Sequence, residues 1–313
     1  MSPREAFIDI GTNTILCLIA ELRDGGRFRV LEDLAEIPRL GEGVDRTRRI
    51  GREGEERSYA VLERYLRRCR ELGVERICTV GTSALRDARN GAAVCRRFRE
   101  RLGLEVRVIS GEEEAAYAFL AVHRGLGLRR GELWVVDIGG GSTEFVRGEP
   151  GGTVEARSVN LGSVRITERF LRSDPVTEAE IRLAVAAIDG AIASTCEPLR
   201  AAAGARTMVG IAGTFTTLAA VARGLRRYSH EAVHGESLGL AEVRRQARLY
   251  GERSIAERKR IVGLDPRRAD VILAGTLLVE RIMTLSGIER VIVSDQGLRY
   301  GLLYERLGVS FRC

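Results

Sequence analysis

Hydrophobic positions follow two different spacings in the first part of the chain. Apolar runs from Ala6 to Ile10 and from Thr14 to Ala20 flank a Gly-Thr-Asn turn, and a further turn signal follows at residues 24–26, which indicates strands joined by hairpins. From Ser58 to Leu72 the apolar residues recur every three or four positions with arginines between them, which predicts an amphipathic helix. The chain thus opens with a β-meander that is followed by a helix.

Two strand-to-helix units are predicted next. A strand from Arg76 to Val80 leads through a Gly-Thr-Ser turn into a helix that carries Arg86. A strand from Leu104 to Ile109 leads through Ser-Gly into a helix that begins near Glu112. This order of strands and helices is typical of an α/β domain.

The same pattern restarts after several glycines between residues 125 and 131. A strand from Leu133 to Ile138, a glycine turn and a strand from Thr143 to Arg147 repeat the opening of the chain. The tripeptide Asp-Ile-Gly closes a strand at residues 9–11 and again at 137–139, and 137 − 9 = 128 residues separate the copies. We therefore predict a duplicated α/β lobe, with domains at residues 1–127 and 128–313 and the last helix packing back on the first lobe.

Two small polar turns occupy matched positions in the predicted lobes. Consecutive glycines let backbone amides approach an anion closely, and Thr, Asn and Ser can donate to phosphate oxygens. A plain hairpin would explain either turn alone, but two matched turns facing a cleft favour phosphate binding. Ligands also bind in loops after the strands of open α/β sheets, which adds predicted loops at 210–214 and 294–297. The candidate phosphate-binding residues are Gly11, Thr12, Asn13, Gly139, Gly140, Gly141, Ser142, Gly213 and Thr214.

Acidic side chains accompany these turns. Asp9 and Asp137 close their strands where a carboxylate would reach the predicted cleft, and Glu144 lies two residues beyond Ser142, on the same face of its strand. Phosphate chemistry usually employs Mg²⁺ to neutralise charge. We therefore predict Asp9, Asp137 and Glu144 as ligands of Mg²⁺ or Mn²⁺, with an ordinary solvated strand position as the alternative for Glu144.

Two further residues are candidates for the reaction itself. The spacing from Ser110 to Glu113 fits a capping box, which explains Glu113 structurally and leaves Glu114 in the first turn of a helix. A helix amino terminus favours the ionised carboxylate that a general base needs, so we predict Glu114 as the base. Arg86 lies four residues after Thr82, where it could clamp a phosphate, and a solvent-exposed arginine is the alternative.

Composition narrows the class of partner. The net charge of +7 suggests an anionic partner, but Lys259 is the only lysine, and a genomic bias toward arginine explains the charge better than dedicated nucleic-acid binding. Aromatic residues are sparse, which disfavours stacking on single strands. No signal peptide or membrane-length apolar run is recognised, so we expect a cytoplasmic protein. His230 and His234 are four positions apart, but without acidic or cysteine partners they are poor candidates for a metal site.

Ordered blocks of sequence resemble one family, the exopolyphosphatases and guanosine pentaphosphate phosphohydrolases of the actin, sugar-kinase and Hsp70 superfamily. The resemblance implies an α/β fold of two actin-like (ribonuclease H-like) lobes with mixed sheets flanked by helices, a cleft between the lobes, and a homodimer. Longer members continue into a C-terminal HD-like region, and this chain resembles a short form without it. The blocks follow the family's usual order along nearly the whole chain: AFIDIGTNT, GTSALRDARN, ISGEEEA, DIGGGSTEF, NLGSVRITERF, GIAGTFTTLA, RADVILAG and VSDQGLRYG.

The resemblance also implies a reaction, which is hydrolysis of a terminal phosphate with Mg²⁺. Glu114 matches the family's proposed base, Arg86 its phosphate-contacting arginine, and Asp137 and Glu144 the acids of its DIGGGSTE block. We expect an exopolyphosphatase in which Glu114 activates water to attack the end of inorganic polyphosphate, with guanosine pentaphosphate (pppGpp) as the alternative substrate. A kinase of the same superfamily and a non-catalytic polyphosphate-binding protein stay open as rivals.

Overall fold

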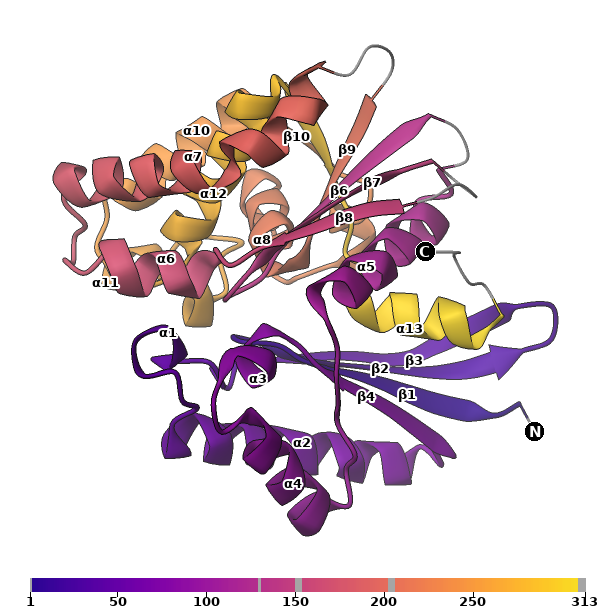
Figure 1. Cartoon of the computed structure of the whole chain (residues 1–313). Helices are drawn as coiled ribbons and strands as arrows, with labels where there is room; N and C mark the ends of the chain where they lie inside the picture. The colour runs from indigo at the N-terminus through magenta and orange to yellow at the C-terminus, as the bar shows by residue number, and fades with distance from the viewer. Residues whose placement is uncertain (1, 129–130, 150–153, 202–205, 309–313) are drawn as a thin grey trace. The chain divides into compact units, whose positions relative to one another are not determined.

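The first unit is built on a five-stranded sheet with the order β3-β2-β1-β4-β5 (Figure 1). The computed structural model describes residues 2–128, 131–149, 154–201 and 206–308. Strands β1, β2 and β3 pair antiparallel, and β4 and β5 extend the sheet in parallel. The predicted strand from Leu104 to Ile109 shrinks to two residues, because only Arg107 and Val108 pair with β4. The bounds are β1 Arg4–Ile10, β2 Ile15–Arg23, β3 Arg27–Glu36, β4 Arg76–Gly81 and β5 Arg107–Val108.

Both faces of this sheet are covered, because side chains alternate along β1. Ile8 and Ile10 pack with the apolar side chains of α2 and α4. Phe7 packs on the opposite face with residues of α5 and α13. The predicted amphipathic helix is α2, which begins earlier than expected. The helices of the unit are α1 Val44–Thr47, α2 Arg52–Glu71, α3 Ser83–Asp87, α4 Gly91–Leu102, α5 Gly111–Gly125 and α13 Leu298–Arg306.

The second unit repeats the strand order of the first. Its sheet runs β10-β11-β9-β6-β7-β8, so that β8-β7-β6-β9-β11 corresponds to β3-β2-β1-β4-β5, and β10 is an added edge strand. Both sheets join an antiparallel meander to parallel strands, which confirms the predicted duplication and the predicted class of two mixed sheets flanked by helices. The bounds are β6 Glu132–Ile138, β7 Thr143–Gly148, β8 Val154–Val159, β9 Arg206–Ile211, β10 Ser237–Gly239 and β11 Arg290–Val293.

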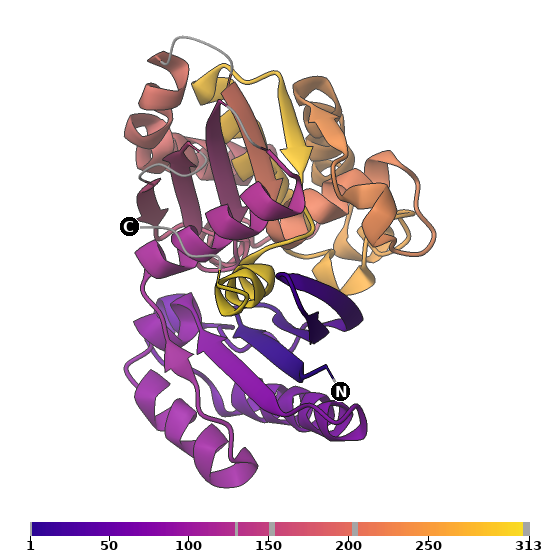
Figure 2. The same ribbon diagram turned by 90° about the vertical axis from the view of Figure 1, so that its right-hand side faces the viewer.

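One face of the second sheet carries the larger core. Trp134, Val136 and Ile138 of β6 face this core together with apolar residues of the helices. Asp137 therefore lies on the opposite face of β6. The helices pack beside the sheet in both views (Figure 1 and Figure 2). They are α6 Ser163–Phe170, α7 Glu178–Ala201, α8 Ala212–Ala222, α9 His230–Val233, α10 Leu240–Gly251, α11 Ile255–Arg258, the 3₁₀ helix η1 Pro266–Arg268 and α12 Ile272–Ser286.

The chain passes from one unit to the other twice. The first unit comprises the residues up to Ala121 together with α13, and the second comprises Val122–Gly297. The first passage therefore falls inside α5, whose first turn belongs to the first unit and whose last turn belongs to the second. The second passage falls between Gly297 and Leu298. Across the described part of the chain, no helix is both long enough and apolar enough to span a membrane.

Candidate active site

The two glycine-containing turns are closed by the same hydrogen bond. Gly11 N donates to Thr14 O at 3.0 Å, and Gly139 N donates to Ser142 O at 3.0 Å. Each turn joins two antiparallel strands, β1 to β2 in the first unit and β6 to β7 in the second. The sequence repeat is therefore a repeat of turn geometry as well.

The carbonyl groups of the second turn accept hydrogen bonds from α6. Backbone amides at the start of α6 donate to the carbonyls of Gly139 and Gly140 at 2.9–3.1 Å, and Arg165 Nε donates to Gly141 O at 2.8 Å. In a trans peptide the N–H points opposite to the preceding C=O, so the amides of Gly140, Gly141 and Ser142 point away from α6. Neighbouring amides that point the same way form a binding site for an anion.

The first turn is held by the loop that follows β3. Thr12 O accepts from Gly41 N at 2.8 Å and Asn13 O accepts from Arg39 N at 3.1 Å, so the amides that follow these carbonyls point away from the loop. Thr12 Oγ1 shares a hydrogen bond of 2.7 Å with Ser83 Oγ at the start of α3. A Cβ on Gly41 would lie 2.4 Å from Thr12 Cγ2, which explains why a glycine is needed there. Both turns thus present amides on one side.

Asp137 and Glu144 form a cross-strand pair. They are direct partners in the β6–β7 register, and their exposed fractions are 8% and 1%. Ser158 of β8 donates through Oγ to Glu144 Oε1 at 2.8 Å. Partners of this kind have Cβ atoms about 5 Å apart, and two carboxylates so close disfavour each other's charge. A cation beside the pair would remove that repulsion.

This pair suits a hard divalent cation. Mg²⁺ takes oxygen ligands and is commonly held by one or two carboxylates together with phosphate oxygens and water. Among the residues that the structure describes, no cluster of three or more His, Cys, Asp or Glu could hold a metal. Asp9 belongs to β1 of the first unit, and metal binding by Asp9, Asp137 and Glu144 stays a prediction.

The first turn of α5 contains the neighbouring residues Glu113 and Glu114, which have different hydrogen-bond partners. Glu113 N donates to Ser110 Oγ at 3.1 Å and Ser110 N donates to Glu113 Oε2 at 3.0 Å, which confirms the predicted capping box. The Ser110 amide and then the Arg107 guanidinium hold the pKa of Glu113 below its usual value. Glu114 is 9% exposed and lies outside this box.

Glu114 is paired with Arg86. Arg86 Nη1 lies 3.2 Å from Glu114 Oε2 and donates to Ile109 O at 3.0 Å. The guanidinium stabilises negative charge on the carboxylate, and an ionised carboxylate shielded from solvent can accept a proton from water. The structure therefore brings together the two residues that were predicted separately as base and clamp.

Comparison with known proteins decides the family. The Ppx/GppA phosphatase family matches residues 18–309. The chain belongs to this family. It is 35% identical to exopolyphosphatase 2 of Mycobacterium tuberculosis, over 97% of this chain and 99% of that protein. It is 30% identical to a guanosine-5'-triphosphate,3'-diphosphate pyrophosphatase of Aeromonas hydrophila, over 100% of this chain and 61% of that protein.

A solved structure of the same family agrees with the fold. The Aquifex aeolicus Ppx/GppA family member is 35% identical to this chain and covers 98% of each chain with a TM-score of 0.80. These matches confirm the resemblance that the ordered sequence blocks indicated. They also confirm that this Ppx/GppA protein is an enzyme of the phosphoanhydride hydrolase class.

The predicted loop at residues 210–214 is wrong for this Ppx/GppA protein. Strand β9 runs directly into α8, because Ala212 makes the whole turn with a left-handed φ of 69°. A Cβ on Gly213 would lie 2.1 Å from the Arg268 guanidinium, and one on Gly275 would lie 2.6 Å from Thr214 Oγ1. Gly213 and Thr214 are thus closely packed, and their contacts with phosphate stay a prediction.

Three residues beside the site groups of this Ppx/GppA protein were missed from sequence. Ser83 bonds Thr12, Ser158 bonds Glu144, and Arg165 bonds the carbonyl of a turn glycine. The sequence signal that could have identified Ser83 was its position in the turn after β4. Ser158 lies outside the quoted sequence blocks and could be found only from the pairing of β8 with β7. Arg165 lies in the block NLGSVRITERF, but its bond to the turn follows only from the docking of α6.

Proposed function

We propose that this Ppx/GppA protein is an exopolyphosphatase that hydrolyses the terminal phosphate of inorganic polyphosphate. The match to exopolyphosphatase 2 of M. tuberculosis carries the proposal, since 35% identity spans 97% of this chain and 99% of that protein. The chemistry of the described groups supports it: backbone amides suited to an anion, a buried pair of carboxylates, and a carboxylate beside a guanidinium.

In the proposed reaction, Glu114 accepts a proton from a water molecule whose oxygen attacks the terminal phosphorus. The bond from that phosphorus to the bridging oxygen breaks, orthophosphate leaves, and the shortened chain keeps the bridging oxygen. Arg86 holds the Glu114 carboxylate and adds positive charge where negative charge develops on the phosphate oxygens. The amides of Gly140, Gly141 and Ser142 bind the phosphate, because N–H donors need no reorganisation during the reaction.

Asp137 and Glu144 would hold Mg²⁺, which when bound neutralises charge on the phosphate oxygens. Ser158 fixes one oxygen of Glu144 through its hydrogen bond. The two acids flank the turn at residues 139–142, since they stand opposite each other at the ends of the strands that this turn joins. A phosphate on the turn amides would thereby adjoin the carboxylate pair.

Guanosine pentaphosphate is the second candidate substrate. The 30% identity to the A. hydrophila pyrophosphatase extends over the whole of this chain, which favours a related reaction. The terminal 5'-phosphate of that nucleotide is also the end of a phosphoanhydride chain, so the same water attack and the same proton acceptor would serve. The choice between the substrates rests on groups that bind the guanosine.

The test is a measurement of released orthophosphate from short polyphosphate, long polyphosphate and guanosine pentaphosphate, each with Mg²⁺ and with a chelator. We expect the highest kcat/KM for polyphosphate and loss of turnover in the chelator. A higher kcat/KM for the nucleotide would replace the first candidate with the second. Release from none of the three substrates would overturn both.

A further inference from the structure

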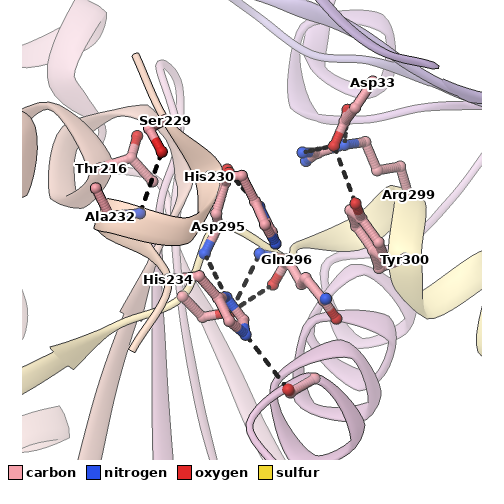
Figure 3. A network of polar contacts seen from close by, with 12 residues as sticks. Asp33, Thr216, Ser229, His230, Ala232, His234, Asp295, Gln296, Arg299 and Tyr300 are labelled. Atoms are coloured by element: carbon pink, nitrogen blue, oxygen red, sulfur yellow. Dashed lines mark hydrogen bonds and ion pairs between the residues drawn. The ribbon is translucent and has the colours of Figure 1, made fainter. Parts of the chain in front are cut away.

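His234 connects three separate segments of the second unit (Figure 3). Its Nε2 lies 3.3 Å from the carbonyl oxygen of Gly125, the last residue of α5. On the other side of the ring, Asp295 N donates to Nδ1 at 3.3 Å and Ser294 Oγ lies 3.5 Å from the same atom. These distances are at the long end of the hydrogen-bond range. His234 itself follows the short helix α9.

The partners of His234 determine its protonation. The Gly125 carbonyl can only accept, so Nε2 carries a hydrogen, and the Asp295 amide can only donate, so Nδ1 carries none. The ring is therefore neutral in one tautomer. Burial is the main cause that lowers the pKa of His234; the Gly125 carbonyl and the Asp295 carboxylate oppose this, and the charge of His230 adds to it.

His230 supports this arrangement from α9. The two imidazole rings stack, with centroids 5.0 Å apart and planes 15° from parallel. His230 Nδ1 lies 2.7 Å from Asp295 Oδ2. The acidic partner that the sequence did not show near these histidines is thus Asp295, from the loop after β11. This cluster holds polar groups in place, and it is not one of the groups suited to a metal among the described residues.

The segments that His234 joins are the two at which the chain passes between the units. Gly125 ends the turn of α5 that belongs to this unit, and Asp295 lies just before Gly297, its last residue before α13. The same segments also touch directly, because a Cβ on Gly125 would lie 2.2 Å from Gln296 Oε1. His234 therefore holds the end of α5 and the segment before α13 together within the second unit.

The other end of the second passage is anchored separately in the first unit. Arg299, in the first turn of α13, makes two hydrogen bonds of 2.7 and 2.8 Å with Asp33 of β3. Tyr300 donates to the same carboxylate at 3.1 Å (Figure 3). Arg299 is 6% exposed, whereas Asp33 is an exposed residue, so the anchor is buried on the Arg299 side only. The freedom of the second passage is thus confined to the few residues between Asp295 and Arg299.

We propose that His234 is a positioning residue of this enzyme, which as a neutral imidazole clamps the last turn of α5 to the segment that precedes α13. This inference rests on the proposed function, in which Glu114 acts as the base. Glu114 lies in the first turn of α5, about 16 Å along the helix from Gly125. Because a helix transmits a displacement of one end to the other, the clamp limits the motion of the helix that carries Glu114, and a misplacement of about 1 Å can cost about 10²-fold in rate.

Protonation releases the clamp. A proton on Nδ1 turns the acceptor of the Asp295 amide into a donor, so two N–H groups face each other. The charged or titratable groups that face His234 are His230 from α9 and Asp295 from the loop after β11, and α5 contributes the Gly125 carbonyl. Because the folded-state pKa lies below the ordinary value of 6.5, the unfolded chain binds more protons between the two values. The clamp is therefore complete above about pH 6.5 and is lost as the pH falls.

Backbone hydrogen exchange tests the clamp without relying on activity. The peptides that cover residues 120–128 and 292–298 are followed in the wild-type protein at pH 7.5 and pH 5.5, with correction for the intrinsic effect of pH. We expect about tenfold faster exchange in these peptides in His234→Phe at pH 7.5, and faster exchange in the wild-type protein as the pH falls, with β6 unaffected. His123→Gln, which removes a histidine from α5 outside the clamp, should behave as wild type.

The kinetic arm tests positioning. His234→Phe should lower kcat for phosphate release about tenfold with KM unchanged, and His123→Gln should leave both unchanged. Unchanged exchange in both peptides, at low pH and in His234→Phe alike, would overturn the clamp. Faster exchange with a normal kcat would overturn the positioning role. If wild-type protein releases no phosphate, the proposed function fails while the exchange result still decides the clamp.

Discussion

Arg86 Nη1 lies 3.2 Å from Glu114 Oε2, and the two side chains are 25% and 11% exposed. The same nitrogen also donates to Ile109 O, just before the helix that carries Glu114. The guanidinium thereby fixes the carboxylate to the loop from which α5 starts. The carboxylate of Glu114 is therefore held in place before any substrate arrives, and the first two predictions depend on this pair.

Glu114→Gln should remove the base while keeping the shape of the side chain. We expect kcat for phosphate release from polyphosphate to fall about 10² to 10⁴-fold, with polyphosphate binding preserved. Glu112→Gln is the matched control, since Glu112 is an exposed glutamate in the same turn of α5. Phosphate release and calorimetric binding measure the two quantities. Near-normal turnover in Glu114→Gln would reject Glu114 as the base.

The Arg86–Glu114 pair should also couple in the free energy of unfolding. Arg86→Met alone leaves a largely buried carboxylate without its guanidinium, whereas Arg86→Met with Glu114→Gln removes both charges. We therefore expect a coupling energy of about 1–3 kcal/mol in a double-mutant cycle measured by urea unfolding. Strictly additive effects would show that the pair contributes nothing to stability.

Asp137 and Glu144 should repel each other when no cation is bound. We expect Asp137→Asn and Glu144→Gln to melt no lower than wild type in a chelator, because each removes one of two facing charges. With Mg²⁺ alone, the wild-type melting temperature should rise and that of the two variants should not. Glu155→Gln, an exposed acid on β8, is the control. An equal rise in all four proteins would place the Mg²⁺ elsewhere.

Local features of this protein were predictable from the sequence because they depend on neighbouring residues. The strands around the two Asp-Ile-Gly turns follow from their apolar runs and turn residues, and Ser110 and Glu113 lie three positions apart, as a capping box requires. The repeat after 128 residues predicted the shared strand order of the two sheets, because copies of one sequence pattern bury their apolar faces in the same way. The ordered blocks also indicated the family.

Only the tertiary structure decided which distant side chains meet. Arg86 contacts Glu114 across 28 positions and His234 contacts Gly125 across 109, and nothing in the local pattern of either segment encodes these contacts. They follow from the packing of helices and strands, which places one loop beside another once each core is buried. The clearest local error was at residues 210–214, where a single left-handed residue, Ala212, replaced the expected loop. The sequence thus determined the strands and helices, the turn residues and the candidate residues. Tertiary packing determined which of those residues contact one another.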